Sequence, residues 1–138
     1  MPSIFEIENE IVEEFSLFDD PMDRYDYIID IGKKLPAFPE AFRGDDFLVK
    51  GCQSAVWLHA YTKDGLLYFD ADSNTAITKG IVSLLVRVFS GQKPSDILTT
   101  EPTFIEKINL RSHLSSQRSN GLNAMLQKMK WYAEIYSA

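Results

Sequence analysis

The sequence has a single cysteine, Cys52, and this scarcity of thiols excludes several classes of protein. One thiol cannot close a disulfide within the chain, so the usual mark of a secreted protein is missing. A dithiol redox centre of the thioredoxin type is excluded for the same reason. Iron–sulfur clusters normally take about four protein ligands and zinc takes three or four, a set that one cysteine and two histidines do not supply. We therefore expect no metal centre.

Long apolar runs and an excess of basic charge are also missing. No stretch approaches the ~18 apolar residues of a membrane span, and the acidic start MPSIFEIENEIVEEF differs from the basic start of signal and transit peptides. We expect a cytoplasmic protein that does not enter a membrane. The chain has 14 Lys and Arg against 20 Asp and Glu, a net charge of −6, and no basic stripe interleaved with aromatics, which argues against nucleic acid as a partner. Acidic residues crowd positions 1–46, a distribution typical of a solvated surface that could also orient a protein partner.

The length predicts one domain spanning residues 1–138, and apolar residues at helical spacing predict four main helices. Ser3 and Glu6 form a capping-box pattern before the first helix, and Asp20-Pro21 supplies an N-cap and a first-turn proline for the second. The third is expected between about residue 73 and residue 91. One or two short helical turns are expected between residues 94 and 108. The last helix starts near residue 115 and is predicted to bury Leu122, Met125, Met129, Tyr132 and Ile135.

Between the second and third helices the apolar period changes from helical to alternating. The segment LPAFPEAFRGDD contains two prolines and a glycine and reads as an irregular connection. Three strands are predicted after it, at residues 47–50, 54–63 and 66–70. Asp64-Gly65 is a strong two-residue hairpin signal between the last two. The expected fold is α+β, with a three-stranded antiparallel sheet packed against helices in a two-layer domain.

Cys52 falls in a predicted tight turn, KGCQ, between the first two strands. A free cysteine is usually a small buried hydrophobe, but loops lie on the surface and carry function more often than strands do. Gly51 permits a backbone angle that other residues resist, and Gln53 is expected to hold the turn through side-chain-to-backbone bonds. A cysteine hydrolase would need a histidine within reach. His113, in the loop before the last helix, is the candidate, whereas His59 in mid-strand is expected to be packed or on the surface.

Four segments of the chain resemble the SufE family of sulfur-acceptor proteins in order and spacing: RYDYIIDIGKKLP, VKGCQSAVWL, DSNTAITKGIVSLL and HLSSQRSNGLNAM. The resemblance extends from about residue 24 to residue 131, and Gly-Cys-Gln-Ser is its most specific part. It implies an α+β fold like that of the IscU-type scaffold proteins. It also implies that Cys52 accepts sulfur as a persulfide from a pyridoxal-phosphate-dependent cysteine desulfurase and passes it to an iron–sulfur scaffold or another acceptor. The pyridoxal phosphate belongs to the partner.

The chain departs from the family pattern at two positions. Ser116 stands where the family usually has proline, a change that costs little at a helix start. Asn74 stands where an acidic residue is common, which bears on a partner contact. Arg118 matches the arginine that the family has near the cysteine loop, and it is expected to fix the loop or to contact the desulfurase. The alternatives are a cysteine-dependent small hydrolase or thiol transferase, and a non-catalytic interaction module.

Acidity of the Cys52 thiol is not expected to be the main source of its reactivity. An ordinary thiol with a pKa of ~8.5 is about 3% ionised at pH 7. Lowering the pKa to ~7 through Arg118 would raise the thiolate population about sixteen-fold but lower its nucleophilicity about five-fold, a net gain of about three-fold. Position and access should therefore matter more, and we expect the turn to shelter Cys52 between encounters with a partner.

Overall fold

The computed structural model describes residues 2–137, apart from the side chain of His113. Two amphipathic helices begin the chain, α1 (Ile4–Ser16) and α2 (Pro21–Lys33). Ser3 caps α1 by accepting a hydrogen bond from the Glu6 N–H, and Asp20 caps α2 by accepting one from the Met22 N–H. Both predicted helix starts are confirmed. The segment after α2 contains two short 3₁₀ turns, η1 (Glu40–Phe42) and η2 (Asp45–Phe47).

The sheet is a single antiparallel hairpin of β1 (Val56–Lys63) and β2 (Leu66–Ser73). Asp64 and Gly65 both have positive φ, at 54° and 80°, as a two-residue hairpin turn of this type requires. Alternate side chains of β1 (Val56, Leu58 and Ala60) are buried, as the alternating pattern predicts. The second strand extends three residues beyond its predicted end because Val56 pairs with Ser73.

The predicted third strand at residues 47–50 is wrong. The N–H of Phe47 donates to the Gly44 carbonyl and that of Leu48 to the Asp45 carbonyl, closing the 3₁₀ turn η2. These two groups are therefore not available to a sheet ladder. What remains is an isolated bridge between Leu48 and Trp57, in which the Val49 N–H donates to the Val56 carbonyl at 2.8 Å. The fold is a mostly helical α+β fold with a two-stranded sheet.

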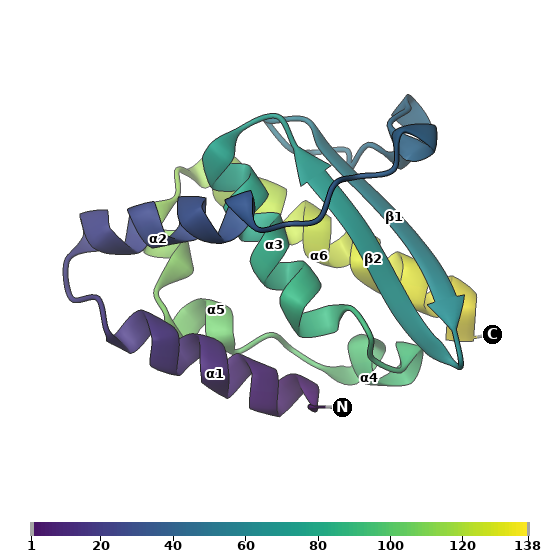
Figure 1. Ribbon diagram of the computed structural model, residues 1–138, viewed down its shortest axis with the longest axis horizontal. Coiled ribbons are helices and arrows are strands. Elements are labelled where there is room, and N and C mark those ends of the chain that lie inside the picture. The colour runs from purple at the N-terminus through teal and green to yellow at the C-terminus, as the bar shows by residue number, and fades with distance from the viewer. Residues whose placement is uncertain (1, 138) are drawn as a thin grey trace.

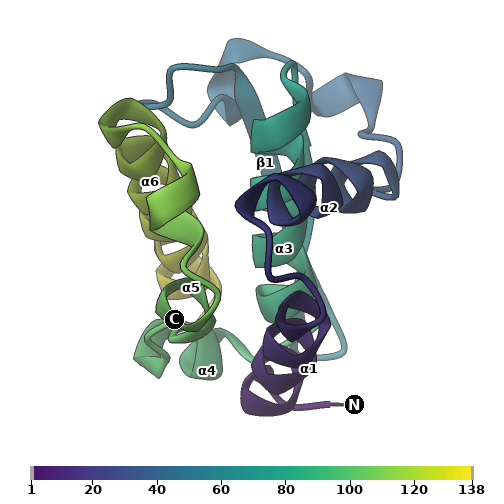
Figure 2. The same ribbon diagram turned by 90° about the vertical axis from the view of Figure 1, so that its left-hand side faces the viewer.

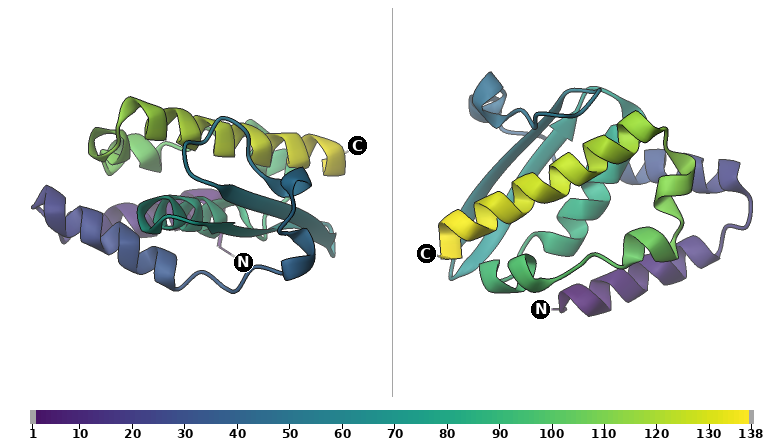
Figure 3. Two further views of the ribbon diagram at one scale, coloured as in Figure 1. Left: turned by 90° about the horizontal axis from the view of Figure 1, so that it is seen from above. Right: turned by 180° about the vertical axis from the view of Figure 1, so that it is seen from behind.

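Helices cover the inner face of the hairpin. α3 (Ala76–Phe89) packs against β2, and α6 (Ser116–Ser137) lies across both. Between these two helices the chain forms α4 (Pro94–Thr99), α5 (Phe104–Lys107), which packs against α1, and the 3₁₀ turn η3 (Leu110–His113). Figure 1 shows α6 running behind the hairpin, and the right-hand view of Figure 3 shows it crossing the hairpin and α3 diagonally. Tyr132 and Tyr136 of α6 donate to the carbonyls of Leu58 and Ala60. Ile135, predicted to be buried, is 49% exposed, whereas Tyr132 and Ala133 are the residues that face the core near this end of α6.

Close packing of α2 on α3 organises the other half of the molecule. Figure 2 shows α6 standing apart from α1 and α2. A Cβ atom at Gly80 of α3 would lie 2.1 Å from the carbonyl oxygen of Ile28, and one at Gly32 would lie 2.7 Å from the Gly80 nitrogen. The two backbones therefore approach more closely than any side chain at position 80 allows. No helix within residues 2–137 is long and apolar enough to cross a membrane.

The outer face of the hairpin is covered by residues 37–47, here called the strap. In Figure 1 the chain passes from α2 in front of β2 to reach η1 and η2. The Phe42 ring stacks on His59 with centroids 3.6 Å apart, and the Arg43 guanidinium lies 4.9 Å from the Trp57 ring. The strap leads directly to the bridge at Leu48 and then to Cys52.

Candidate functional site

Cys52 lies in the loop between the Leu48–Trp57 bridge and β1. Gly51, beside it, has a φ of +92°, the positive angle that the sequence predicted for this turn. A Cβ atom at Gly51 would lie at an ordinary 3.5 Å from the Ala124 Cβ of α6. Glycine is therefore favoured here by the backbone angle rather than by lack of space.

The C-terminal side of this loop is firmly attached to the start of α3. The Ser54 hydroxyl accepts hydrogen bonds from Thr75 at 3.0 Å and Thr78 at 3.3 Å. The Ala55 N–H donates to the Asn74 side chain at 3.0 Å, so the residue that departs from the family pattern helps to hold the loop. Together with the Val49 bond on the other side, these contacts leave residues 50–53 as the segment between two anchors.

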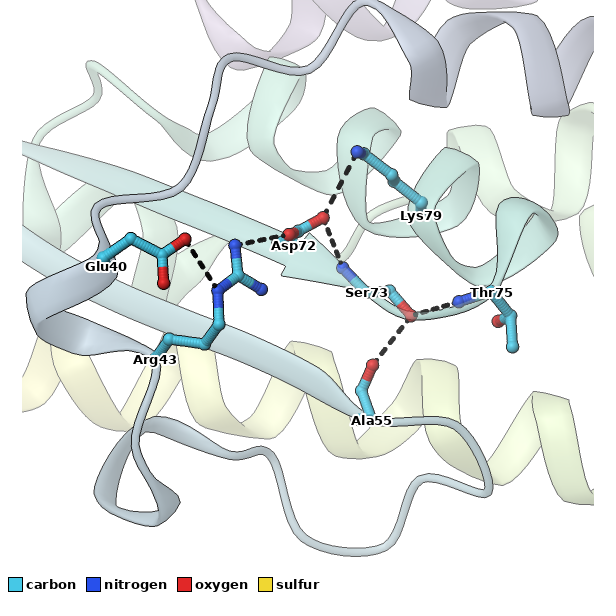
Figure 4. A network of polar contacts seen from close by, with 7 residues as sticks. All are labelled: Glu40, Arg43, Ala55, Asp72, Ser73, Thr75 and Lys79. Carbon is cyan, nitrogen blue, oxygen red and sulfur yellow. Dashed lines mark hydrogen bonds and ion pairs between the residues drawn. The ribbon is translucent and has the colours of Figure 1, made fainter.

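A polar network joins the strap to the same end of the sheet, as Figure 4 shows. Arg43 and Lys79 contact the Asp72 carboxylate from two sides, at 2.9 and 3.3 Å. Burial alone would raise the pKa of Asp72, but hydrogen bonds from the Ser73 N–H, Arg43 and Lys79 outweigh it and lower the pKa. The Ser73 hydroxyl then donates to the Ala55 carbonyl at 2.8 Å. The network thus ties the segment entering the Cys52 loop to the segment leaving it.

The Cys52 thiol points toward the N-terminal part of α6. Its Sγ donates to the backbone carbonyl of Gly121 at 3.5 Å, and a Cβ atom at position 121 would lie 3.5 Å from the same sulfur. The thiol is half-buried and packs against the hydrophobic core. Burial raises the pKa of Cys52. This direction is the opposite of the decrease in the Cys52 pKa that was considered as an effect of Arg118. In this conformation the thiol is sheltered and protonated rather than activated.

Two cavities of different character adjoin Cys52. On the inner side a closed cavity of about 10 Å³ is lined by Cys52, Gln53, Ser54, Thr78, Ile81, Arg118, Gly121 and Met125. On the outer side an open groove of about 320 Å³ is lined by Gly51, Cys52, Gln53, Gln117 and Asn120. The sequence reasoning singled out neither Gly121 nor the two amides of the groove as site residues, although all three lie within the segment HLSSQRSNGLNAM.

The structure brings Arg118 and Gln53 together with Cys52, since all three line the closed cavity. Arg118 lies in the first turn of α6, where the helix dipole disfavours a cation. Its position is therefore not explained by the stability of the helix. The side chain of His113 lies outside the described part of the structure. His59 lies on the outer face of the hairpin, with its Nδ1 3.1 Å from Asp70 Oδ2 and its ring against Phe42, which agrees with a packing role.

Comparisons with known proteins identify the family. Residues 9–133 match the family model described as SufE: Fe-S metabolism associated domain. An uncharacterized SufE-like protein of Rhizobium meliloti is 40% identical over 131 residues, which cover 91% of this chain and 94% of that protein. The cysteine desulfuration protein SufE of Wigglesworthia glossinidia brevipalpis is 32% identical over 121 residues, covering 86% of this chain and 84% of its own. The chain belongs to the SufE family.

A solved structure supports the fold independently. The solution structure of a hypothetical protein from Thermus thermophilus superimposes with a TM-score of 0.78. The match covers 94% of this chain and 95% of the other at 20% sequence identity. At this level of identity the likeness shows a shared fold.

Proposed function

We propose that the protein is a sulfur acceptor and activator of a pyridoxal-phosphate-dependent cysteine desulfurase. Cys52 carries the sulfur as a persulfide and delivers it to an iron–sulfur scaffold or another acceptor. The observation that carries the proposal is the placement of the only thiol of a SufE-family chain in a short anchored loop beside an open groove. The protein uses no cofactor of its own in this role, since the pyridoxal phosphate belongs to the desulfurase.

The transfer step is a thiol–persulfide exchange. The Cys52 thiolate attacks the outer sulfur of a persulfide on the desulfurase, so that a new bond forms from Sγ to that sulfur. The bond between the two donor sulfurs breaks, and the donor cysteine leaves as a thiolate. The proton of Cys52 goes to solvent or to that leaving thiolate, and no net oxidation occurs. A second exchange of the same kind then transfers the outer sulfur from Cys52 to the acceptor.

The residues around Cys52 act on position and access. Gly51 permits the turn, and Gln53 lines both cavities beside the sulfur. Arg118 contacts the partner or orients the loop when the two proteins meet. His113 is proposed as a further supporting or partner-contact residue. Because burial raises the pKa of Cys52 in the sheltered state, binding of the desulfurase must expose the thiol before the exchange.

The experiment compares alanine release by a cysteine desulfurase, with free cysteine as substrate, in the presence of wild-type protein or Cys52→Ala. The wild type should accelerate alanine release several-fold, and Cys52→Ala should compete with it for binding without accelerating. Equal acceleration by both would favour a non-catalytic interaction module. Turnover of an ester or disulfide substrate without any desulfurase, lost in His113→Ala, would favour the cysteine-dependent hydrolase or thiol transferase.

A further inference from the structure

We propose that the hydrogen bond from Cys52 Sγ to the Gly121 carbonyl holds the loop closed while Cys52 is a free thiol. When Cys52 carries a second sulfur this bond is lost, and the loop opens. The loop would thereby distinguish the empty carrier from the loaded one. This inference rests on the proposed function for its biological meaning, but its chemistry concerns this chain alone.

The hydrogen bond requires the hydrogen of the thiol. In a persulfide the inner sulfur is bonded to Cβ and to the outer sulfur, so it has no hydrogen to donate. The Sγ atom that lies 3.5 Å from the Gly121 oxygen would then set a lone pair against that oxygen instead. Gly121 lies within α6, so its carbonyl keeps its helical partner when Cys52 leaves. Loss of the donor therefore weakens the closed loop without leaving a buried carbonyl unpaired.

The space beneath Cys52 does not admit another sulfur atom. The closed cavity measures about 10 Å³, at the lower limit of ~10–15 Å³ needed for one water. A sulfur atom is larger than a water oxygen. The outer sulfur must therefore lie on the side of the open groove, beside Gln117 and Asn120, or push residues 50–53 away from α6.

Charge acts in the same direction. A persulfide is more acidic than a thiol and is largely anionic at neutral pH. The half-buried position already disfavours the anion of Cys52 itself, as its raised pKa shows. Among the described residues that line the two cavities, the charged one is Arg118, on the closed side. Arg118 attracts the anion, but the closed cavity has no room for the outer sulfur, so the anion is better hydrated in the open groove.

The anchors of the loop allow this movement without loss of the sheet. The contacts of Val49, Ser54 and Ala55 lie outside residues 50–53 and need not break. Gly51, in the positive-φ region, is the position at which the backbone can turn most freely. The result is a carrier that presents its sulfur only when loaded, whereas the empty thiol waits for the desulfurase to open the loop.

Hydrogen–deuterium exchange with mass spectrometry tests this proposal on three forms of the whole protein. The forms are the free thiol, the persulfide made with inorganic polysulfide, and the methyl disulfide made with methyl methanethiosulfonate. In the first reaction Cys52 displaces a shorter polysulfide anion, and in the second it displaces methanesulfinate. Both products lack the thiol hydrogen, but the methyl disulfide bears no charge. Cys52→Ala treated with polysulfide controls for modification elsewhere.

Both modified forms should exchange the amides of residues 50–53 about tenfold faster than the thiol form, with β1 and β2 unchanged. Exchange within twofold of the thiol rate in either modified form would overturn the proposal. Faster exchange spread over the whole hairpin would also overturn it, because it would mean general unfolding. No desulfurase is present, so failure of sulfur transfer from the enzyme would count against the proposed function and leave this result intact.

Discussion

The Cys52 sulfur lies 3.5 Å from the carbonyl oxygen of Gly121, although 69 positions separate the two residues in the chain. Position 121 would place any Cβ atom in contact with that sulfur. The Cys52 loop and the N-terminal part of α6 therefore pack together as one unit. This packing half-buries the thiol, and burial raises its pKa.

The first prediction concerns the reactivity of the thiol. Because burial raises the pKa of Cys52, its thiolate should appear at higher pH in the native protein than in the unfolded chain. Native Cys52 should accordingly react more slowly with iodoacetamide at neutral pH, and the difference should narrow as the pH rises through the native pKa. Alkylation rates across a pH series, with and without urea, measure this. Equal rates in the two states would contradict the sheltered position.

The same pKa shift makes a stability prediction. The folded state holds the Cys52 proton more tightly than the unfolded state, so the associated stability is fully present below the unfolded pKa of ~8.5. It is lost as the pH rises through the native pKa. The free energy of unfolding should therefore fall in alkaline solution more steeply for the wild type than for Cys52→Ala. Parallel urea titrations at neutral and alkaline pH compare the two slopes.

Gly80→Ala should disrupt the contact between α2 and α3. The added Cβ would lie 2.1 Å from the Ile28 carbonyl oxygen, so the helices must separate. We expect a cost of about 3 kcal/mol from overpacking, against about 1 kcal/mol gained in helix propensity, and hence a fall in Tm of about 8 °C. Gly44→Ala is the matched control, since its Cβ meets nothing within 4 Å and its φ is negative. If thermal unfolding gives Gly80→Ala and Gly44→Ala the same Tm, the close approach of α2 and α3 is contradicted.

Asp72→Asn tests the network beneath the strap. The mutation should lower the free energy of unfolding at pH 7 by about 1 kcal/mol. Since the folded pKa of Asp72 is lowered, this difference should be present above the unfolded pKa of ~3.9 and disappear as the pH falls through the folded pKa. Urea unfolding at several pH values measures it. Asp30→Asn is the control, because Asp30 forms an exposed pair with Lys33 and its mutation should have no such effect on the free energy of unfolding. If Asp72→Asn lowers the free energy of unfolding equally at pH 7 and at acid pH, an electrostatic origin is excluded.

Arg118→Ala should separate partner recognition from intrinsic reactivity. We expect sulfur transfer from the desulfurase to fall about tenfold, as for loss of a charged contact at an interface, while loading of Cys52 by inorganic polysulfide stays within twofold. Arg111→Ala is the control, because that arginine pairs with Glu106 of α5 and Asn123 of α6 and does not line either cavity beside Cys52. Equal losses in both variants, or a loss of polysulfide loading in Arg118→Ala, would contradict a partner-contact role.

Local signals in the sequence were sufficient for the helices and the hairpin. Ser3, Asp20 and Asp64-Gly65 each determine a cap or a turn through their own side chain or backbone, and each stands where it was predicted. The expected third strand failed because apolar alternation at residues 47–50 does not reveal that the amides of Phe47 and Leu48 are already bonded within η2. The spacing of apolar residues does not indicate which acceptor a backbone N–H will bond to.

The candidate site, too, could be predicted from the sequence only in part. The turn glycine at position 51 and the proximity of Arg118 to Cys52 followed from the KGCQ pattern and from the family resemblance. The contact with Gly121 and the Arg43–Asp72 pair could not be found in this way, because both join residues distant in the chain and depend on how elements pack. The direction of the Cys52 pKa shift depends on that packing as well.

Intact-protein mass spectrometry tests the central claim most directly. The protein is incubated with a cysteine desulfurase and free cysteine, without reductant, beside Cys52→Ala under identical conditions. The wild type should gain the mass of one sulfur atom, and the variant should gain none. If the desulfurase turns over and the wild-type mass stays unchanged, Cys52 is not the sulfur carrier.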